Sequence, residues 1–269
     1  MRRSGFQNII YYVFSNRHCM KAMYIAVDME KSMFKDFRDL FFPRKCTVCG
    51  RLLLAEEEHI CGPCRADLPL TRFWVQVGNP AEERIWQRAG IVAAASLYFY
   101  RYAGGYANLV RAVKYGGNAK LGRALGHRLG EELRSCGRFD GVQAIVPVPL
   151  HPLRRLRRGY NQAEIIALGL AEGLWPDDGG KARRRLIIHL LHRRRNTRTQ
   201  TRLDSEQKAA NLKNAFSQDN RIAARLKGEG ISHILLVDDV LTSGATISAA
   251  ALPLMEHFLI SVATVGFVE

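Results

Sequence analysis

The chain has 269 residues, of which 47% are hydrophobic and 24% are charged, and 40 Lys and Arg exceed 25 Asp and Glu to give a net charge of +15. This composition is typical of a globular protein with one large domain or two modest ones, and it excludes collagen, coiled-coil and fully disordered chains. No apolar run is long enough to span a bilayer, so the sequence also excludes a transmembrane helix.

The positive charge is concentrated between His151 and Arg202, where thirteen Lys and Arg face four Asp and Glu for a net charge of +9. Such a segment favours a polyanionic ligand, either a phosphorylated small molecule, a nucleic acid or an acidic surface, and an ordinary solvated surface is the alternative. Its most basic part, Arg183 to Arg202, is either a loop that closes over pyrophosphate or a track for single-stranded DNA. The lack of aromatic residues from 176 to 215 weakens the DNA interpretation of this stretch.

Residues 1–33 have no clear hydrophobic period and contain several methionines. They form either a short extra helix or an extension that results from a start assigned too early. The charged beginning is followed by neither a long apolar core nor a small-residue cleavage site, so we expect no secretory signal and a cytoplasmic protein.

Four cysteines form two Cys-x-x-Cys pairs that are separated by eleven residues: Cys46, Cys49, Cys61 and Cys64. In a reducing compartment, paired cysteines at this spacing usually hold zinc. Gly50 and the Gly62-Pro63 dipeptide supply the tight turns that metal-binding knuckles need. Since four thiolates complete a tetrahedral site, we expect structural rather than catalytic Zn²⁺.

A helical pattern at 34–41 is followed, after the cysteines, by a mixed segment at 69–90 that we interpret as a linker or a domain-joining arm. From there on, strands alternate with helices. The expected strands are 91–100, 142–150, 186–191, 231–237 and 262–268. The expected helices are a short one that includes 109–113, between Gly105 and Gly116, and those at 121–133, 161–174, 205–216 and 246–258. This alternation predicts an α/β fold with a mostly parallel sheet and helices on both faces, preceded by a small four-cysteine zinc unit. We expect an extension at 1–33, the zinc unit at 34–75 and the α/β domain at 76–269. Gly122, Gly126 and Gly130 favour close packing of one helix on the sheet.

The sharpest motif is a four-residue apolar strand that ends in Asp238 and Asp239 and is followed by a loop with the hydroxyl groups of Thr242, Ser243 and Thr246. Ligands bind at the carboxyl ends of parallel strands, and loop amides before a helix favour a phosphate. The two acids can accept hydrogen bonds from sugar hydroxyls or help to hold a metal ion. The chain has neither a Walker loop nor a dinucleotide-binding glycine turn. Helix capping with a surface salt bridge is the ordinary alternative for the acid pair.

This motif resembles the 5-phosphoribosyl-1-pyrophosphate (PRPP) signature of type I phosphoribosyltransferases, and the surrounding motifs resemble the ComF family, which is linked to competence for DNA uptake. ComF members typically carry a cysteine-rich zinc unit before the transferase domain. The further motifs, over about residues 34–269, are Val113-Lys114-Tyr115-x-Gly117, Val146 to His151, Arg158 to Gln162, Arg195-x-Thr197-x-x-Gln200, and Asn211 with Ala215-Phe216. The chain departs from the family pattern at Lys208, where Arg is common, and at Ser243, where Thr is common.

The resemblance implies that Asp238 and Asp239 are catalytic and contact the ribose hydroxyls of PRPP. It implies that the 5-phosphate is wrapped by the loop residues Thr242, Ser243, Gly244, Ala245 and Thr246. Phosphoribosyl transfer releases pyrophosphate, which Mg²⁺ and basic side chains would stabilise. The candidates for that role are Lys114, Arg158 and Arg195, and simple surface charge is the alternative for each.

Two functions therefore stay open at this point. The first is a Mg²⁺-dependent phosphoribosyltransferase with an unidentified acceptor, serving either DNA uptake or nucleobase salvage. The second is a module with little turnover that binds nucleotide or single-stranded DNA and docks on a DNA-uptake helicase. Neither the acceptor nor the oligomeric state is encoded in a recognisable motif.

Overall fold

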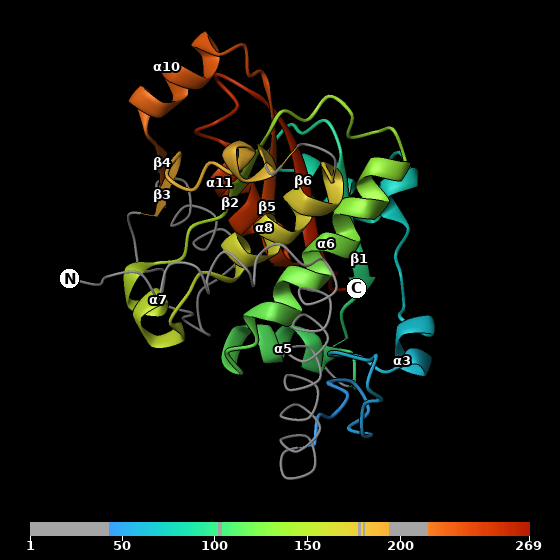
Figure 1. Ribbon diagram of the computed structural model, residues 1–269. Coiled ribbons are helices and arrows are strands. Elements are labelled where there is room, and N and C mark those ends of the chain that lie inside the picture. Colours follow the sequence, from blue (N-terminus) through green and yellow to red (C-terminus); the bar gives the residue numbers. More distant parts are fainter. Residues whose placement is uncertain (1–42, 102–103, 177–178, 180, 194–214) are drawn as a thin grey trace, which may run out of the picture. The chain divides into compact units, whose positions relative to one another are not determined.

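The structure is a computed structural model that describes residues 43–101, 104–176, 179, 181–193 and 215–269 (Figure 1). The expected extension at 1–33, the helical pattern at 34–41 and the candidate Arg195 lie outside these residues. Among the described residues two compact units are present, a small one with residues 43–46 and 50–61, and a larger one with residues 47–49 and those from 62 onward. Every helix in the described ranges is too short or too polar to cross a bilayer.

The small unit is built from turns. A single antiparallel bridge pairs Lys45 with Leu52, and the chain reverses at Gly50, whose φ of 79° suits glycine. The Arg44 guanidinium donates a hydrogen bond to the carbonyl of Glu57 over 2.8 Å. The bridge and this side-chain hydrogen bond hold the ends of a loop in which Leu52 and Leu54 are exposed.

The larger unit contains a four-stranded sheet in the order β1-β6-β5-β2, in which every neighbouring pair is parallel. The strands are β1 (Ala94–Phe99), β2 (Ala144–Pro147), β5 (His233–Leu241) and β6 (Leu259–Phe267). This confirms the predicted fold class of a mostly parallel α/β sheet. The central strand β5 is buried from His233 to Val237, as expected for an apolar run covered on both faces.

The prediction of a strand at 186–191 is wrong. Leu186 makes one parallel bridge with Ile145 at the edge of the sheet, and the chain then turns away. β3 (Leu191–Arg193) instead pairs antiparallel with β4 (Phe216–Gln218) in a separate two-stranded sheet. The predicted helix toward residue 216 lies largely outside the described residues, and Phe216 itself is in a strand. The apolar run at 186–191 suggested a strand of the main sheet, but Leu190 and Leu191 are buried outside that sheet.

Helices cover both faces of the sheet (Figure 1). The α-helices are α3 (Gly62–Ala66), α4 (Pro80–Trp86), α5 (Ala107–Tyr115), α6 (Ala119–Ser135), α7 (Pro152–Arg158), α8 (Gln162–Leu174), α10 (Asn220–Gly228) and α11 (Ala245–Ala251). Ile85 of α4 and Ile247 of α11 share a core cluster with Ile234 and Leu236 of β5. Because strand side chains alternate, the intervening Leu235 faces the opposite side, where α8 packs.

The segment at 69–90 is not a linker. It contains a short 3-10 helix, Phe73–Val75, followed by α4, and the Phe73 side chain is buried in the core. The Phe73 ring makes edge-on contacts with Phe99 and Phe267, with centroids 5.6 and 5.1 Å away. Asn79 caps α4 by accepting hydrogen bonds from the amides of residues 81 and 82. The proline and glycine in this segment therefore mark helix boundaries.

The expected glycine packing occurs between two helices and not between a helix and the sheet. A Cβ atom at Gly126 of α6 would lie 2.1 Å from the Ile166 carbonyl oxygen, and one at Gly169 of α8 would lie 1.9 Å from the Arg123 carbonyl oxygen. The two backbones can approach this closely only because these positions lack side chains. The contact fixes α8, whose first turn borders the acid pair.

Candidate functional site

Asp238 and Asp239 lie at the carboxyl end of β5, as predicted, and the loop 242–244 leads from there into α11. The Asp239 amide donates a hydrogen bond to Asp238 Oδ1 over 2.8 Å. The Lys114 ammonium, from the last turn of α5, lies 3.0 Å from Asp239 Oδ1. Since the side chains of Lys114 and Asp239 are only 23% and 15% exposed, this pair is largely shielded from solvent.

The proximity of these charges shifts the pKa values. Burial, followed by repulsion from Asp239, raises the pKa of Asp238 to about 7, although the Asp239 amide, Lys114 and Arg193 partly oppose the rise. Burial alone would lower the pKa of Lys114, but the charge of Asp239 and its hydrogen bond outweigh burial and raise it. A half-buried carboxyl that titrates near neutral pH is the kind of group found at binding and catalytic sites.

Both acids line a small cavity of about 40 Å³. Asn161 and Gln162 at the start of α8, Arg193 of β3 and Thr246 of α11 complete its polar wall. The side chain of Asn161 accepts a hydrogen bond from the Ala163 amide and so caps the start of α8.

Arg193 is a cation of this site that the sequence did not single out. Burial lowers the pKa of its guanidinium, as does the charge of Arg154, whereas Asp238 raises it. Its neighbours in the basic stretch, from residue 194 to 202, lie outside the described residues. Arg193 became recognisable only once the β3–β4 pair brought it to the cavity.

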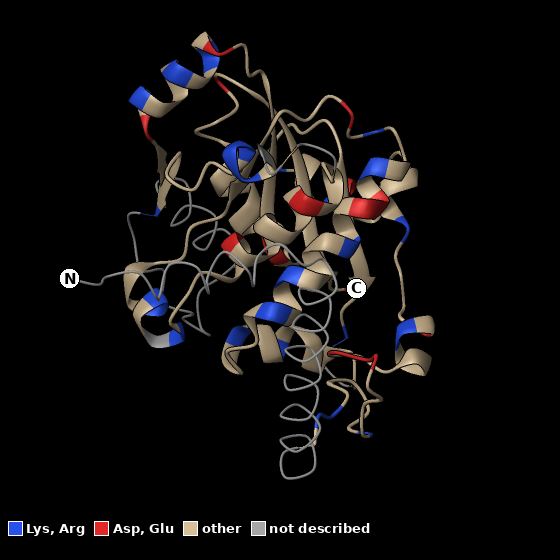
Figure 2. Cartoon of the chain, viewed as in Figure 1, with Lys and Arg blue, Asp and Glu red and all other residues tan. Residues whose placement is uncertain are grey.

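Arg158, at the end of α7, also lies at this site. Its guanidinium donates a hydrogen bond to Gln162 Oε1 over 2.9 Å and lies 5.2 Å from the centroid of the Tyr115 ring. All charged residues of α7 are arginines, and α5, α6 and α10 also carry Lys and Arg (Figure 2). The structure therefore brings two of the predicted cations, Lys114 and Arg158, next to the acid pair.

The residues of the loop after the acid pair border two separate spaces. Thr246 lines the cavity of the acid pair, whereas Thr242 and Ser243 line a separate groove of about 550 Å³ against α4. On that side, Arg84 donates to the Thr242 carbonyl over 2.8 Å and Arg88 donates to the Ser243 carbonyl over 2.9 Å.

These two arginine contacts set the direction of the loop amides. The described chain has no cis peptide bond, and in a trans peptide the N–H points opposite to the carbonyl of the preceding residue. The amides of Ser243 and Gly244 therefore point away from α4. Gly244 has a φ of 75°, which a residue with a side chain rarely adopts, so it supports the turn into α11. Arg84 and Arg88 lie in the segment interpreted as a linker, and no sequence motif marked them.

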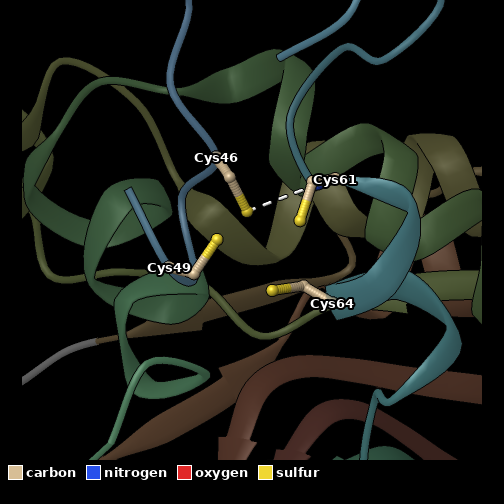
Figure 3. Close-up of side chains that lie close together, drawn as sticks. All are labelled: Cys46, Cys49, Cys61 and Cys64. Atoms are coloured by element: carbon tan, nitrogen blue, oxygen red, sulfur yellow. Dashed lines mark hydrogen bonds between the residues drawn. The ribbon is translucent and has the colours of Figure 1, made fainter. Parts of the chain in front are cut away.

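The four predicted metal ligands converge (Figure 3). The sulfur atoms of Cys46, Cys49, Cys61 and Cys64 all lie within 4.8 Å of one another. A Zn²⁺ ion with four Zn–S bonds of about 2.3 Å places its sulfurs roughly 3.8 Å apart, so the cluster fits zinc after a small contraction. The Cys61 amide donates a hydrogen bond to the Cys46 sulfur over 3.3 Å, which stabilises a thiolate. The four cysteines supply all four ligands of a tetrahedral site, as a structural zinc site requires.

A family model for a double zinc ribbon domain matches residues 37–86. The match extends well past the second cysteine pair, but residues 65–86 contain neither Cys nor His. This part of the chain therefore offers cysteine ligands for one zinc ion, and the remainder of the matched region contributes Phe73 and α4 to the core of the α/β unit.

The chain is similar over most of its length to curated proteins from several bacteria. The protein named DNA utilization protein YhgH from Escherichia coli K12 is 29% identical over 216 residues, which cover 79% of this chain and 84% of the relative. Competence protein F from Haemophilus influenzae is 29% identical over 223 residues, which cover 77% and 89%. A YhgH protein from Salmonella typhi is 28% identical over 237 residues, which cover 81% and 93%.

These relatives, the zinc ribbon match and the mostly parallel α/β sheet agree with the motifs found in the sequence. Together they support a ComF family protein with an N-terminal zinc unit ahead of its α/β domain.

Proposed function

We propose that the acid pair and the loop after it bind the ribose 5-phosphate part of PRPP or of a related nucleotide, and that the protein serves DNA uptake or DNA utilisation. The observation that carries the ligand assignment is the loop held by Arg84 and Arg88, whose amides point away from α4, directly after two acids on a central parallel strand. The names of the relatives, DNA utilization protein and competence protein, supply the process.

In this proposal the ribose hydroxyls donate hydrogen bonds to the carboxylates of Asp238 and Asp239. The amides of Ser243 and Gly244, together with the Thr246 hydroxyl, donate to the phosphate, since backbone amides in a turn form a suitable anion site. The present cavity is little larger than one water molecule, so a sugar phosphate has to lie across its mouth or widen it.

Mg²⁺ fits the same place, because it is usually held by one or two carboxylates together with substrate phosphates. Lys114 already neutralises Asp239, so Asp238 is the carboxylate available to the ion. A bound Mg²⁺ would neutralise a leaving pyrophosphate. Lys114, Arg158 and Arg193 are the chain's own cations on that side, and Arg195 stays a candidate by its motif alone.

A second function is supported by the charge distribution. The segment from His151 to Arg202 carries a net charge of +9, and α7 within it combines arginines with two exposed leucines, Leu153 and Leu156. This pattern favours a module that holds single-stranded DNA or a partner such as a DNA-uptake helicase without turnover. The two functions differ in one measurable respect, the release of pyrophosphate.

Isothermal titration with ribose 5-phosphate, and with PRPP and Mg²⁺, tests the ligand assignment. We expect the double variant Asp238→Asn, Asp239→Asn to lose binding of both ligands. The matched control is Asp140→Asn with Glu229→Gln, which removes two exposed acids elsewhere and leaves binding unchanged. Wild-type affinity in the Asp238, Asp239 double variant would refute the assigned roles.

Turnover is tested separately by measuring pyrophosphate release from PRPP with a panel of nucleobases. Release that depends on one base identifies the acceptor. If PRPP binds but no base supports release, the protein acts as the binding module and not as a transferase.

A further inference from the structure

An exposed aromatic ring stands beside the acid pair. Tyr115 is the last residue of α5, and its neighbour Lys114 makes the 3.0 Å ion pair with Asp239. Among the described residues, Tyr115 and Trp86 are the large aromatic side chains that are exposed, by 75% and 43% respectively. The Tyr115 ring contributes little to the core, and the residue before it in the helix belongs to the charged site.

One face of this ring is already occupied by a cation. The Arg158 guanidinium carbon lies 5.2 Å from the Tyr115 ring centroid, within the range of a cation–π contact. Arg158 is oriented in turn by its hydrogen bond to Gln162, which is 1% exposed and lines the cavity of the acid pair. The ring and the cavity are therefore joined by one chain of side-chain contacts.

The backbone around the ring is held in place. The Tyr160 hydroxyl donates a hydrogen bond to the Val113 carbonyl over 2.5 Å and so ties the turn between α7 and α8 to the end of α5. Gly117 adopts a φ of 64°, and a Cβ at Gly116 would lie 2.9 Å from the Ala112 carbonyl oxygen. The two glycines end the helix at once and leave the Tyr115 side chain uncovered. A ligand that stacks here does not have to order the platform first.

We propose that Tyr115 and Arg158 form a stacking platform for a nucleobase, next to the acid pair that takes the ribose. The inference rests on the proposed function for the position of the sugar and adds the chemical class of the group attached to it. A base stacks on the ring face opposite Arg158, since every base offers an aromatic face and a ring with a nearby guanidinium favours it. The base belongs either to a free nucleotide or to a nucleotide within single-stranded DNA.

Calorimetric titrations of the full chain with three probes separate these possibilities: ribose 5-phosphate, adenosine 5′-monophosphate and a short oligothymidylate. Tyr115→Ala should weaken binding of the base-containing probe by about 5- to 150-fold, the range that corresponds to removal of a stacking aromatic. It should leave ribose 5-phosphate binding within about twofold of the wild type. Tyr115→Phe keeps the ring and should retain binding of the base-containing probe.

Trp86→Ala is the matched control, because it removes the other exposed aromatic ring and should affect none of the probes. Thermal unfolding of Tyr115→Ala should match the wild type, since the ring is mostly in water. Equal loss of ribose 5-phosphate binding in Tyr115→Ala would overturn the platform, because the residue would then only shape the acid pair.

The platform is also refuted if Tyr115→Ala binds the monophosphate and the oligonucleotide as the wild type does, or if the wild type binds neither. If the base-containing probes bind in a way that depends on Tyr115 but ribose 5-phosphate does not bind, the proposed sugar site is refuted and the stacking platform is retained. If only the monophosphate needs Tyr115 for binding, the base comes from a free nucleotide; if the oligonucleotide needs it, the base comes from single-stranded DNA.

Discussion

Replacing Asp238 with Asn should stabilise the protein at alkaline pH. The folded protein holds the Asp238 proton more tightly than the unfolded chain does, because burial and Asp239 raise its pKa from 3.8 to about 7. Ionisation of Asp238 therefore costs folding free energy. This cost is absent below the unfolded pKa, grows as the pH rises, and is complete above the folded pKa. An Asn at this position stays neutral at every pH and avoids the cost.

The size of the effect follows from the shift. A difference of one pKa unit corresponds to about 1.4 kcal/mol, so between pH 5 and pH 8 the wild type should lose roughly 2–3 kcal/mol of unfolding free energy relative to Asp238→Asn. For a domain of this size, that loss corresponds to a difference of roughly 5–10 °C in melting temperature.

The assay is thermal unfolding of the wild type and Asp238→Asn across this pH range, without Mg²⁺ or phosphate. The melting-temperature difference between the two proteins should widen steadily toward pH 8 and then level off. A melting-temperature difference that does not change with pH, or a variant that is less stable than the wild type at pH 8, would show that ionisation of Asp238 does not destabilise the fold. Increased stability together with lost ligand binding would identify an acid retained for function at the expense of the fold.

Three further predictions follow from other parts of the molecule. Cys46→Ser with Cys49→Ser should release the zinc, and elemental analysis that still finds one metal per chain would refute the ligand set. Arg84→Gln with Arg88→Gln should weaken ribose 5-phosphate binding by about tenfold, because the loop carbonyls lose their hydrogen-bond donors. The corresponding double Lys variant should bind more tightly than the double Gln variant. Equal binding by the wild type and the Gln variant would show that the loop does not need these two hydrogen bonds. Gly169→Ala should lower the unfolding free energy by roughly 1–3 kcal/mol, and a denaturant midpoint equal to the wild type would contradict the close contact of α6 with α8.

Local patterns in the sequence predicted the parts of the fold that depend on local physics. The buried run before Asp238 had to be a central parallel strand, and the two cysteine pairs with their turn residues predicted the metal cluster. The helix at 161–174 was also predicted, and in the structure Asn161 caps it by accepting a hydrogen bond from the Ala163 amide.

The contacts missed by the sequence interpretation join distant segments. Arg84 and Thr242 are 158 residues apart, and no local pattern links an exposed arginine on a short helix to a carbonyl on a remote loop. The helix itself had a signal, since Asn79 followed by Pro80 is a typical helix start. Arg193 was likewise one arginine among many until the β3–β4 pair placed it at the cavity.

A crystal structure of the protein with ribose 5-phosphate tests the proposed ligand site most directly. We expect the phosphate to accept hydrogen bonds from the amides of Ser243 and Gly244 and the sugar hydroxyls to lie against Asp238 and Asp239. A loop that stays empty at saturating ligand, or a sugar bound elsewhere on the molecule, would contradict the assignment of this strand and loop as the ligand site.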